Sequence, residues 1–388
     1  MMRSVYLTDT SWRTAYYACK ALARRGLTVI GLTSVPSIYN RSIYYSDFKT
    51  VPSPESDPDA WISAVEKSIT PGSVLLPISP VSISVVSANA DRLSKKLLIP
   101  CLPQDQLASA FDKLKTISIA SQIGIPVPST IKISDQNDCI EQCRNLSYPI
   151  VLKINIENNW DPKQRYGIAY NQSEVAVIYE KLSKLKTGVI AQEYIIGQGV
   201  GISVLAHKGR IIASYTHQRL REQYITGGPS TFCASYHSEQ LEEYAQRFLK
   251  QSGWSGIFML EFKLNKERNT YYLMEINPRF WGSMELAIRS GINFPYLYYQ
   301  WICGEPIDTV NNKTKHIKLK YLKMDTKAFA TYVHDPHTTS RFLKILRYFG
   351  EYSDFRVRYN LDCKDWKINI PEIIETIKNI GKILYYAF

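Results

Sequence analysis

The clearest pattern in the chain is an alternation of apolar and polar residues in two neighbouring segments, 259–265 and 271–279. A period of two is typical of β-strands, and the short polar segment 266–270 between them has the length of a hairpin loop. Pairing the strands around this loop sets Glu261 opposite Glu275. One face then carries the apolar side chains Phe258, Leu260, Phe262, Leu264, Tyr272, Met274 and Ile276, which we expect to form a core.

The other face of this hairpin carries Glu261, Glu275 and Asn277. Directly opposed residues have Cβ atoms about 5 Å apart, and like charges at that distance destabilise the pair unless a cation lies between them. Two carboxylates and an amide oxygen suit Mg²⁺ or Mn²⁺ that carries the phosphates of a nucleotide. Arg279 adds a planar guanidinium group that can donate two hydrogen bonds to a phosphate or carboxylate. The alternative is a solvent-facing hairpin with two unrelated acids, which is ordinary for an open sheet face.

The first part of the chain has a different pattern, of continuous apolar strands separated by helices. We expect strands at 5–7, 27–33 and 73–77 and helices at 13–25 and 61–69. Such alternation predicts a parallel sheet covered on both faces, in an α/β domain of residues 1–105. Its first turn lacks a GxGxxG motif, so the sequence does not indicate that this domain binds a dinucleotide.

The middle part, residues 106–310, mixes strands and helices. We expect helices at 107–123, 239–251 and 283–290, and strands at 148–154 and 187–195 besides the hairpin. Together with the first domain, this predicts a mixed α/β and α+β protein.

The last part, residues 311–388, is basic, with 15 Lys and Arg against 8 Asp and Glu, or +7 of the chain's net +12. Two amphipathic helices are expected in it, at 341–349 and from Pro371 onward. We expect this extension to pack on the rest of the protein through the apolar faces Phe342, Leu343, Ile345, Leu346, Phe349 and Ile373, Ile374, Ile377, Ile380, Leu384. Peripheral contact with a membrane through the basic tail is the alternative left open.

The 388 residues are 45% hydrophobic and 21% charged, which is typical of a globular protein of two or three domains. No apolar run approaches the length of a membrane span. The N-terminal segment becomes polar too early for a signal peptide. The seven scattered cysteines favour a reducing compartment without a disulfide framework. We therefore expect a cytoplasmic protein that acts on small molecules, with no nucleic-acid partner; a homodimer is left open.

The order of these motifs resembles the ATP-grasp superfamily of carboxylate–amine and carboxylate–thiol ligases, in the branch of carbamoyl-phosphate-synthase-like and amino-acid-ligase domains. The resemblance covers about residues 1–305 and rests mainly on 275–282, Glu-Ile-Asn-Pro-Arg-Phe-Trp-Gly, with Glu261 at hairpin distance upstream. It implies an ATP-grasp fold at 106–310, with a lid subdomain at about 125–195.

The resemblance also implies roles for single residues. Glu261, Glu275 and Asn277 match the ligands of Mg²⁺, and Lys113 and Lys153 match the lysines that contact ATP. Gln192, Glu193, Tyr194 and Ile195 match the hinge that reads adenine and ribose, and Arg279 matches the arginine that holds transferred phosphate or the substrate carboxylate. Arg219 and Arg221, before Gly227 and Gly228, match a segment that borders the acceptor site. These three arginines are the expected catalytic residues.

One departure from the family pattern concerns the lid. Many ATP-grasp enzymes have a glycine-rich segment here, whereas residues 155–167 contain one glycine and the basic residues Lys163 and Arg165. This departure leaves the rate of turnover open.

The activity implied is an ATP- and Mg²⁺-dependent ligase that forms an acyl phosphate and joins the acid to an amine of an amino acid, peptide or amino sugar. The rivals are a bicarbonate-activating enzyme, similar to carbamoyl-phosphate synthase or a carboxylase, and a non-catalytic nucleotide-binding scaffold.

Overall fold

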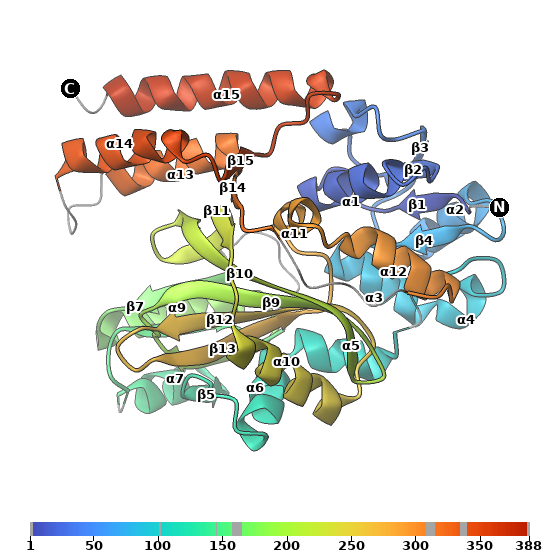
Figure 1. Ribbon diagram of the computed structural model, residues 1–388. Helices are drawn as coiled ribbons and strands as arrows, with labels where there is room; N and C mark the ends of the chain where they lie inside the picture. Colours follow the sequence, from blue (N-terminus) through green and yellow to red (C-terminus); the bar gives the residue numbers. More distant parts are fainter. Residues whose placement is uncertain are drawn as a thin grey trace. The chain divides into compact units, whose positions relative to one another are not determined.

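The computed structural model of the protein describes residues 3–100, 102–144, 146–156, 165–307, 315–333 and 340–385. It divides into two units (Figure 1). Unit 1 contains Met1–Cys101, Ile212–Ser238 and Phe280–Phe388, and unit 2 contains Leu102–Ile211 and Glu239–Arg279. Each unit is described by itself, and the three-domain division expected from the sequence stays a prediction.

Unit 1 begins with the expected parallel sheet, whose strand order is β3-β2-β1-β4. Its strands are β1 (Val5–Leu7), β2 (Val29–Thr33), β3 (Asp47–Thr50) and β4 (Val74–Leu76), and its helices are α1 (Arg13–Ala23), α2 (Pro58–Ser68), α3 (Pro80–Ala88) and α4 (Ala90–Leu93). Tyr6, Leu32, Val65 and Leu75 are among the buried residues of one core in this part. The strand β3 and the 3₁₀ helix η1 (Ile38–Arg41) were not predicted, because β3 is an edge strand without a buried face.

A second group of strands in unit 1 contains β10 (Arg210–Tyr224), β11 (Gly227–Ser235), β14 (Lys318–Lys320) and β15 (Val357–Tyr359). β11 pairs antiparallel with both β10 and β14, and β14 pairs parallel with β15. The helices α11 (Met284–Ser290) and α12 (Phe294–Cys303) complete this part. A buried ion pair joins α1 to α11, since Lys20 Nζ lies 2.5 Å from Glu285 Oε1.

Unit 2 has two layers of strands and helices. The first sheet has the order β5-β8-β6-β7, and the second group pairs β9 with β12 and β12 with β13, all antiparallel. The strands are β5 (Thr130–Ile133), β6 (Ile150–Ile154), β7 (Tyr166–Ala169), β8 (Val189–Glu193), β9 (Gln198–His207), β12 (Gly256–Asn265) and β13 (Thr270–Asn277), and the helices are α5 (Gln104–Phe111), α6 (Lys113–Gln122), α7 (Gln136–Cys143), α9 (Gln172–Ser183) and α10 (Glu239–Ser252). α7 and α9 pack together beside the first sheet, while α6 packs on β13 and α10 on β9 (Figure 1).

The single helix expected at 107–123 is wrong, because the chain forms α5 and α6 with a break between them. Asp112 has an extended backbone, and its side chain accepts a hydrogen bond from the amide of Lys115. An aspartate that caps the second helix satisfies a backbone amide that a continuous helix would satisfy through its own carbonyls. The break sets Lys113 in the first turn of α6.

The C-terminal part of unit 1 is helical, as expected, with α13 (Leu322–Val333), α14 (Arg341–Gly350), the 3₁₀ helix η2 (Glu351–Ser353) and α15 (Trp366–Tyr385). α13 lies beside both α14 and α15 (Figure 1). The second helix begins at Trp366 and holds Pro371 inside it, so the expected start at Pro371 is wrong. None of the described helices is long and apolar enough to cross a membrane.

The expected packing of these helices through their apolar stripes is wrong for most of the predicted residues. Ile345 does pack against the core around Phe329 and Tyr348, and the side chain of Leu384 lies outside the described ones. Phe342, Leu343, Leu346 and Phe349 of α14 are exposed, as are Ile373, Ile374 and Ile377 of α15. The buried positions of α15 are instead Ile368, Thr376 and Ile383. Asn379 of α15 donates to Thr326 Oγ1 of α13 at 3.2 Å, so a mixed polar and apolar face makes the contact.

Candidate functional site

The site predicted from the sequence centres on the β12–β13 hairpin of unit 2. Glu261 pairs with Glu275 in the register, as expected from the alternation. A β-bulge follows, because the next pair is Phe262 with Leu273 and Met274 is the extra residue. A bulge reverses the facing of every later residue of one strand.

This bulge corrects the expected core face. Leu273 and Tyr271 are buried, whereas Met274 and Tyr272 are only partly buried. The alternation of apolar and polar residues therefore predicts the pairing of the two glutamates but misses the change of face in β13.

Asn277 links the acidic pair to Arg279. Its side chain is almost fully buried, and Nδ2 donates to Glu261 Oε1 at 3.1 Å and to Glu275 Oε1 at 3.3 Å. Its Oδ1 accepts from Arg279 Nη2 at 2.9 Å. The hairpin thus brings all three expected metal ligands and Arg279 into one network. Because Nδ2 faces the carboxylates, the side-chain amide of Asn277 would have to flip before its oxygen could ligate a cation between them.

Two lysines approach the same carboxylates from α6 and β6. Lys113 Nζ lies 3.9 Å from Glu275 Oε2, and Lys153 Nζ donates to the backbone oxygen of Met274 at 3.5 Å. The amide of Lys113 donates to the backbone oxygen of Asn155 at 3.2 Å, and the side chain of Asn155 donates to Asp112 at 3.0 Å. The end of β6 is therefore tied to the start of α6, which holds both lysines near the hairpin.

The pKa values reflect this mixture of charges. Desolvation raises the pKa of Glu275, but Lys113, Arg165 and Lys153 outweigh it and lower that pKa to about 2. For Lys153, desolvation and the charge of Lys113 lower the pKa to about 8, against the opposing effect of Glu275 and Glu261. Positive groups suited to phosphate and negative groups suited to a metal thus share one site.

The donor set is small but fits Mg²⁺. Among the described residues, no group of three or more His, Cys, Asp or Glu could hold a metal ion. Mg²⁺ is usually bound through one or two carboxylates together with substrate phosphates and water, so Glu261 and Glu275 with a nucleotide satisfy it. The buried amide of Asn277, held between the carboxylates, is the third candidate ligand.

The expected hinge residues lie at the end of β8 and directly after it. Gln192 is fully buried, its Nε2 donates to Thr130 Oγ1 at 2.8 Å, and its Oε1 has no hydrogen-bond partner among the described residues. Glu193 Oε1 lies 3.5 Å from Arg268 Nη1. The ring of Tyr194 lies 5.4 Å from Lys263 Nζ. Ile195 is buried in the core, so its side chain is structural.

Comparisons with known proteins relate part of the chain to ATP-grasp proteins. Residues 186–324 match the family model described as ATP-grasp in the biosynthetic pathway with Ter operon. The chain is similar to the D-alanine–D-alanine ligase of Carboxydothermus hydrogenoformans, with 28% identity over 200 residues that cover 46% of this chain and 62% of that protein.

Two solved structures show the likeness of fold. The biotin carboxylase of Campylobacter jejuni has a TM-score of 0.66 and 15% identity, with 81% of this chain and 74% of that chain covered. The L-amino acid ligase of Bacillus licheniformis has a TM-score of 0.59 and 18% identity, with 77% of this chain and 74% of that chain covered.

Residues 186–324 therefore match an ATP-grasp family, and the similar ligase and the likeness of fold point to the same superfamily. ATP and Mg²⁺ are the cofactors typical of ATP-grasp proteins, and the acidic and basic residues of the hairpin site suit both. The match covers less than two thirds of the length of the D-alanine–D-alanine ligase. The comparisons therefore do not establish the activity or the substrates of this chain.

The expected acceptor-site arginines lie in unit 1. Arg221 Nη1 donates to both carboxylate oxygens of the fully buried Asp325, at 2.8 and 2.7 Å, and Nη2 donates to Glu351 at 2.8 Å. Lys320, also fully buried, lies 2.6 Å from Glu351 Oε2. These contacts are those of an internal ion-pair network, so the catalytic role of Arg221 stays a prediction.

Arg219 is partly buried and lies near the turn between β10 and β11. Its Nη1 donates to Glu222 at 2.9 Å and to the backbone oxygen of Gly228 at 3.3 Å. Gly227 and Gly228 both have positive φ, of 132° and 101°, as the tight turn requires. A catalytic role for Arg219 also stays a prediction.

The sequence alone missed two residues that the structure links to these sites. Asp325 and Glu351 fall in the segment interpreted as a solvated basic extension, although they neutralise buried cations there. Arg165 affects the pKa of Glu275, and the rest of the expected lid at 157–164, including Lys163, lies outside the described residues. For Asp325 and Glu351, the sequence signal is limited to an acidic residue among several basic ones in a helical pattern.

Proposed function

We propose that the protein is an ATP- and Mg²⁺-dependent ligase that activates a carboxylate as an acyl phosphate and joins it to an amine. The observation that supports this most strongly is the cluster of Glu261, Glu275 and Asn277 with Lys113 and Lys153. A phosphoryl transfer requires little covalent help from a protein, because positioning and charge neutralisation supply most of the rate enhancement. The cluster offers both.

In this proposal Glu261, Glu275 and Asn277 hold Mg²⁺ or Mn²⁺, which would neutralise charge on the phosphates of bound ATP. Lys113 and Lys153 contact those phosphates, and their partial burial strengthens each contact. The hydrogen bond from Arg279 to Asn277 holds the guanidinium beside the acidic pair. Arg279 is therefore assigned to the transferred phosphoryl group or the substrate carboxylate.

The adenine and ribose are assigned to the hinge after β8. Glu193 is partly exposed and can accept from a ribose hydroxyl, and the unpartnered buried Oε1 of Gln192 leaves an acceptor near the hinge. Tyr194 and the backbone at Ile195 complete the hinge. Arg219 and Arg221 are assigned to the acceptor side, where Arg221 acts by positioning β10 through Asp325 rather than by touching the substrate.

The substrate carboxylate attacks the terminal phosphoryl group of ATP, which releases ADP. The amine then attacks the acyl carbon and releases phosphate, so one C–N bond forms for each ATP used. An amino acid as the acceptor is supported by the names of two similar proteins, a D-alanine–D-alanine ligase and an L-amino acid ligase. A peptide or an amino sugar is kept as a further acceptor within the proposal.

Bicarbonate as the activated acid is the second candidate. Biotin carboxylase is among the similar solved structures, with the higher TM-score of the two described. A bicarbonate-dependent enzyme would use the same hairpin site, so the substrate and not the site separates the two candidates.

The test is to measure ADP release over a panel of carboxylates, each with and without a panel of amino acids, dipeptides and amino sugars, and over bicarbonate in parallel. The ligase proposal expects ADP release that requires both an organic acid and an amine. Release with bicarbonate alone would favour the second candidate. ATP binding without ADP release under every condition would favour a non-catalytic scaffold.

A further inference from the structure

The outer face of α14 carries large apolar side chains that no described residue covers. Phe342 and Leu346 are 62% and 52% exposed, and Leu343 and Phe349 are also exposed. Spacings of three and four residues set these side chains on one side of the helix. The opposite side is the packed one, since Tyr348 is buried against Phe329 of α13 with ring centroids 3.9 Å apart.

The outer face of α15 repeats this arrangement. Trp366, Ile370, Ile373, Ile374 and Ile377 follow one another at helical spacing, and all are exposed. The buried side of the helix faces α13. The outer faces of α14 and α15, defined by these apolar residues of the two helices, are called the C-terminal apolar surface below.

Basic residues border both faces. Arg341 and Arg347 are exposed on α14, and Lys367, Lys378 and Lys382 are exposed on α15. Glu375 is paired with Lys378 at 3.0 Å, whereas Glu372 accepts hydrogen bonds from Asn360 and the amide of Lys323. The border of the surface is therefore cationic.

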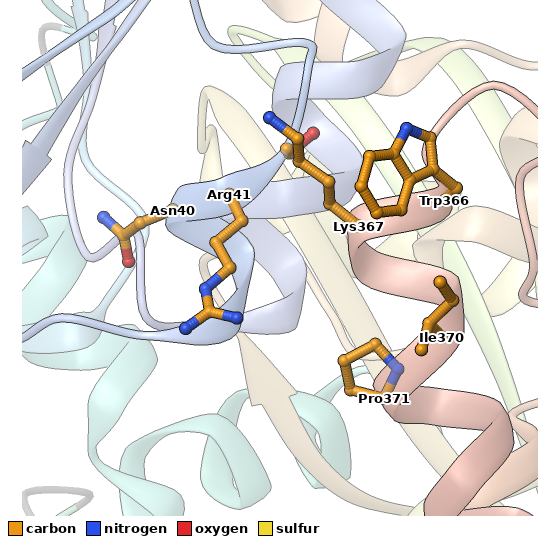
Figure 2. A pocket seen from close by; sticks show the side chains of 7 residues that line it. Asn40, Arg41, Trp366, Lys367, Ile370 and Pro371 are labelled. Carbon is orange, nitrogen blue, oxygen red and sulfur yellow. The ribbon is translucent and has the colours of Figure 1, made fainter.

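A pocket adjoins the start of the α15 stripe (Figure 2). It has a volume of about 570 Å³ and lies between η1, which supplies Asn40 and Arg41, and the first turns of α15, which supply Trp366 and Lys367. Its remaining lining residues are Ser42, Ile370 and Pro371. Two cations, an indole and two further hydrogen-bonding side chains thus meet where an apolar stripe begins.

We propose that the C-terminal apolar surface binds the interface of an anionic lipid bilayer, with a phosphate-bearing headgroup in the pocket of Arg41 and Lys367. An amphipathic helix with an apolar face and a cationic border lies in the plane of such an interface. The apolar side chains enter the boundary between headgroups and acyl chains, and each nearby Lys or Arg gains from the negative surface potential.

The charges argue for a bilayer against a second copy of the chain. Two copies that met through this surface would bring two cationic borders together, and such like charges repel. The segment 311–388 has a net charge of +7, which complements an anionic surface.

The proposal is tested by co-sedimentation of the full chain with phosphatidylcholine vesicles, with and without phosphatidylglycerol. We expect binding only to the vesicles that contain phosphatidylglycerol. The double variants Phe342→Glu/Leu346→Glu and Ile374→Glu/Ile377→Glu should each lower the partition coefficient by about tenfold or more, because they remove apolar contact and add negative charge. The variant Arg41→Ala/Lys367→Ala tests the pocket and should lower binding in the same direction.

The matched control is Tyr170→Glu/Val177→Glu, which adds the same charge at two exposed residues of unit 2, outside the C-terminal apolar surface and its pocket. It should bind as the unchanged protein does. An equal loss of vesicle binding in the control would show that net charge alone explains the effect and would overturn the proposal. Failure of the unchanged protein to bind either kind of vesicle would also overturn it. A dimer in analytical ultracentrifugation that the Phe342→Glu/Leu346→Glu variant abolishes would overturn it in favour of a second copy. Equal melting temperatures of the variants exclude unfolding as the cause.

Discussion

Lys113 Nζ lies 3.9 Å from Glu275 Oε2, and Lys113 is almost fully buried. This contact sets a cation suited to phosphate beside a carboxylate suited to a metal ion. The lysine stabilises the charged form of the glutamate and so contributes to its low pKa. The pair therefore holds two opposite charges together at a partly buried position of the hairpin.

We expect Glu275→Gln to abolish ATP-dependent ADP formation, with kcat lowered by about a hundredfold or more, because half of the carboxylate pair for Mg²⁺ is lost. The measurement is ADP release with the best acid–amine pair. Glu180→Gln, at an exposed glutamate of α9 in the same unit, is the matched control and should retain full turnover. Normal turnover in Glu275→Gln would remove the metal assignment.

We expect Lys153→Ala to weaken ATP binding by about 1.5–3 kcal/mol, the usual size of a charge-assisted hydrogen bond. Isothermal titration calorimetry measures it directly. Lys132→Ala, at an exposed lysine of β5, should leave the affinity unchanged. An affinity equal to that of the unchanged protein would refute the phosphate contact.

We expect Arg221→Ala to lower the free energy of unfolding by about 3–5 kcal/mol, because it leaves the buried carboxylate of Asp325 without its bidentate partner. Arg356→Ala removes an exposed pair with Asp354, which solvent screens, and should cost much less. Urea unfolding of both variants provides the comparison. A stable Arg221→Ala protein with a raised KM for the acid or amine would instead support substrate contact.

We expect the protein to lose stability as the pH falls below 6.5, partly because of His217. Burial, followed by the charge of Arg219, lowers the pKa of His217 from 6.5 to about 3. The unfolded chain therefore takes up this proton first, so the contribution is complete above pH 6.5 and is lost progressively toward pH 3. Between pH 6.5 and 5 the loss from this group is about 1.5–2 kcal/mol.

His217→Gln should flatten this part of the stability profile, since glutamine does not titrate. Urea unfolding at several pH values between 5 and 7 measures the slope for both proteins. Identical slopes would mean that His217 is protonated or exposed in the folded protein.

The sequence predicts the pairing of Glu261 with Glu275 well, because a period of two and a short polar loop fix their register. It does not predict the bulge at Met274, since a single extra residue leaves the apolar pattern almost unchanged. It also does not predict the helix break at Asp112, where a capping side chain competes with an otherwise good helical pattern. Tertiary hydrogen bonds to Asn155 stabilise that break.

The C-terminal helices illustrate the opposite case. Apolar stripes on α14 and α15 are visible in the sequence, and burial is the natural expectation for them. The structure buries the other face of α15, where Asn379 and Thr376 make hydrogen bonds. Periodicity identifies an apolar face, but only the neighbouring elements decide whether that face is covered.

The central claim is that the protein activates a carboxylate with ATP, and hydroxylamine trapping tests it most directly. Hydroxylamine captures an acyl phosphate as a stable hydroxamate. With ATP, Mg²⁺ and the correct acid, we predict hydroxamate in a one-to-one ratio with ADP, and none for Glu275→Gln. ADP release from the unchanged protein without hydroxamate for any organic acid would contradict the account.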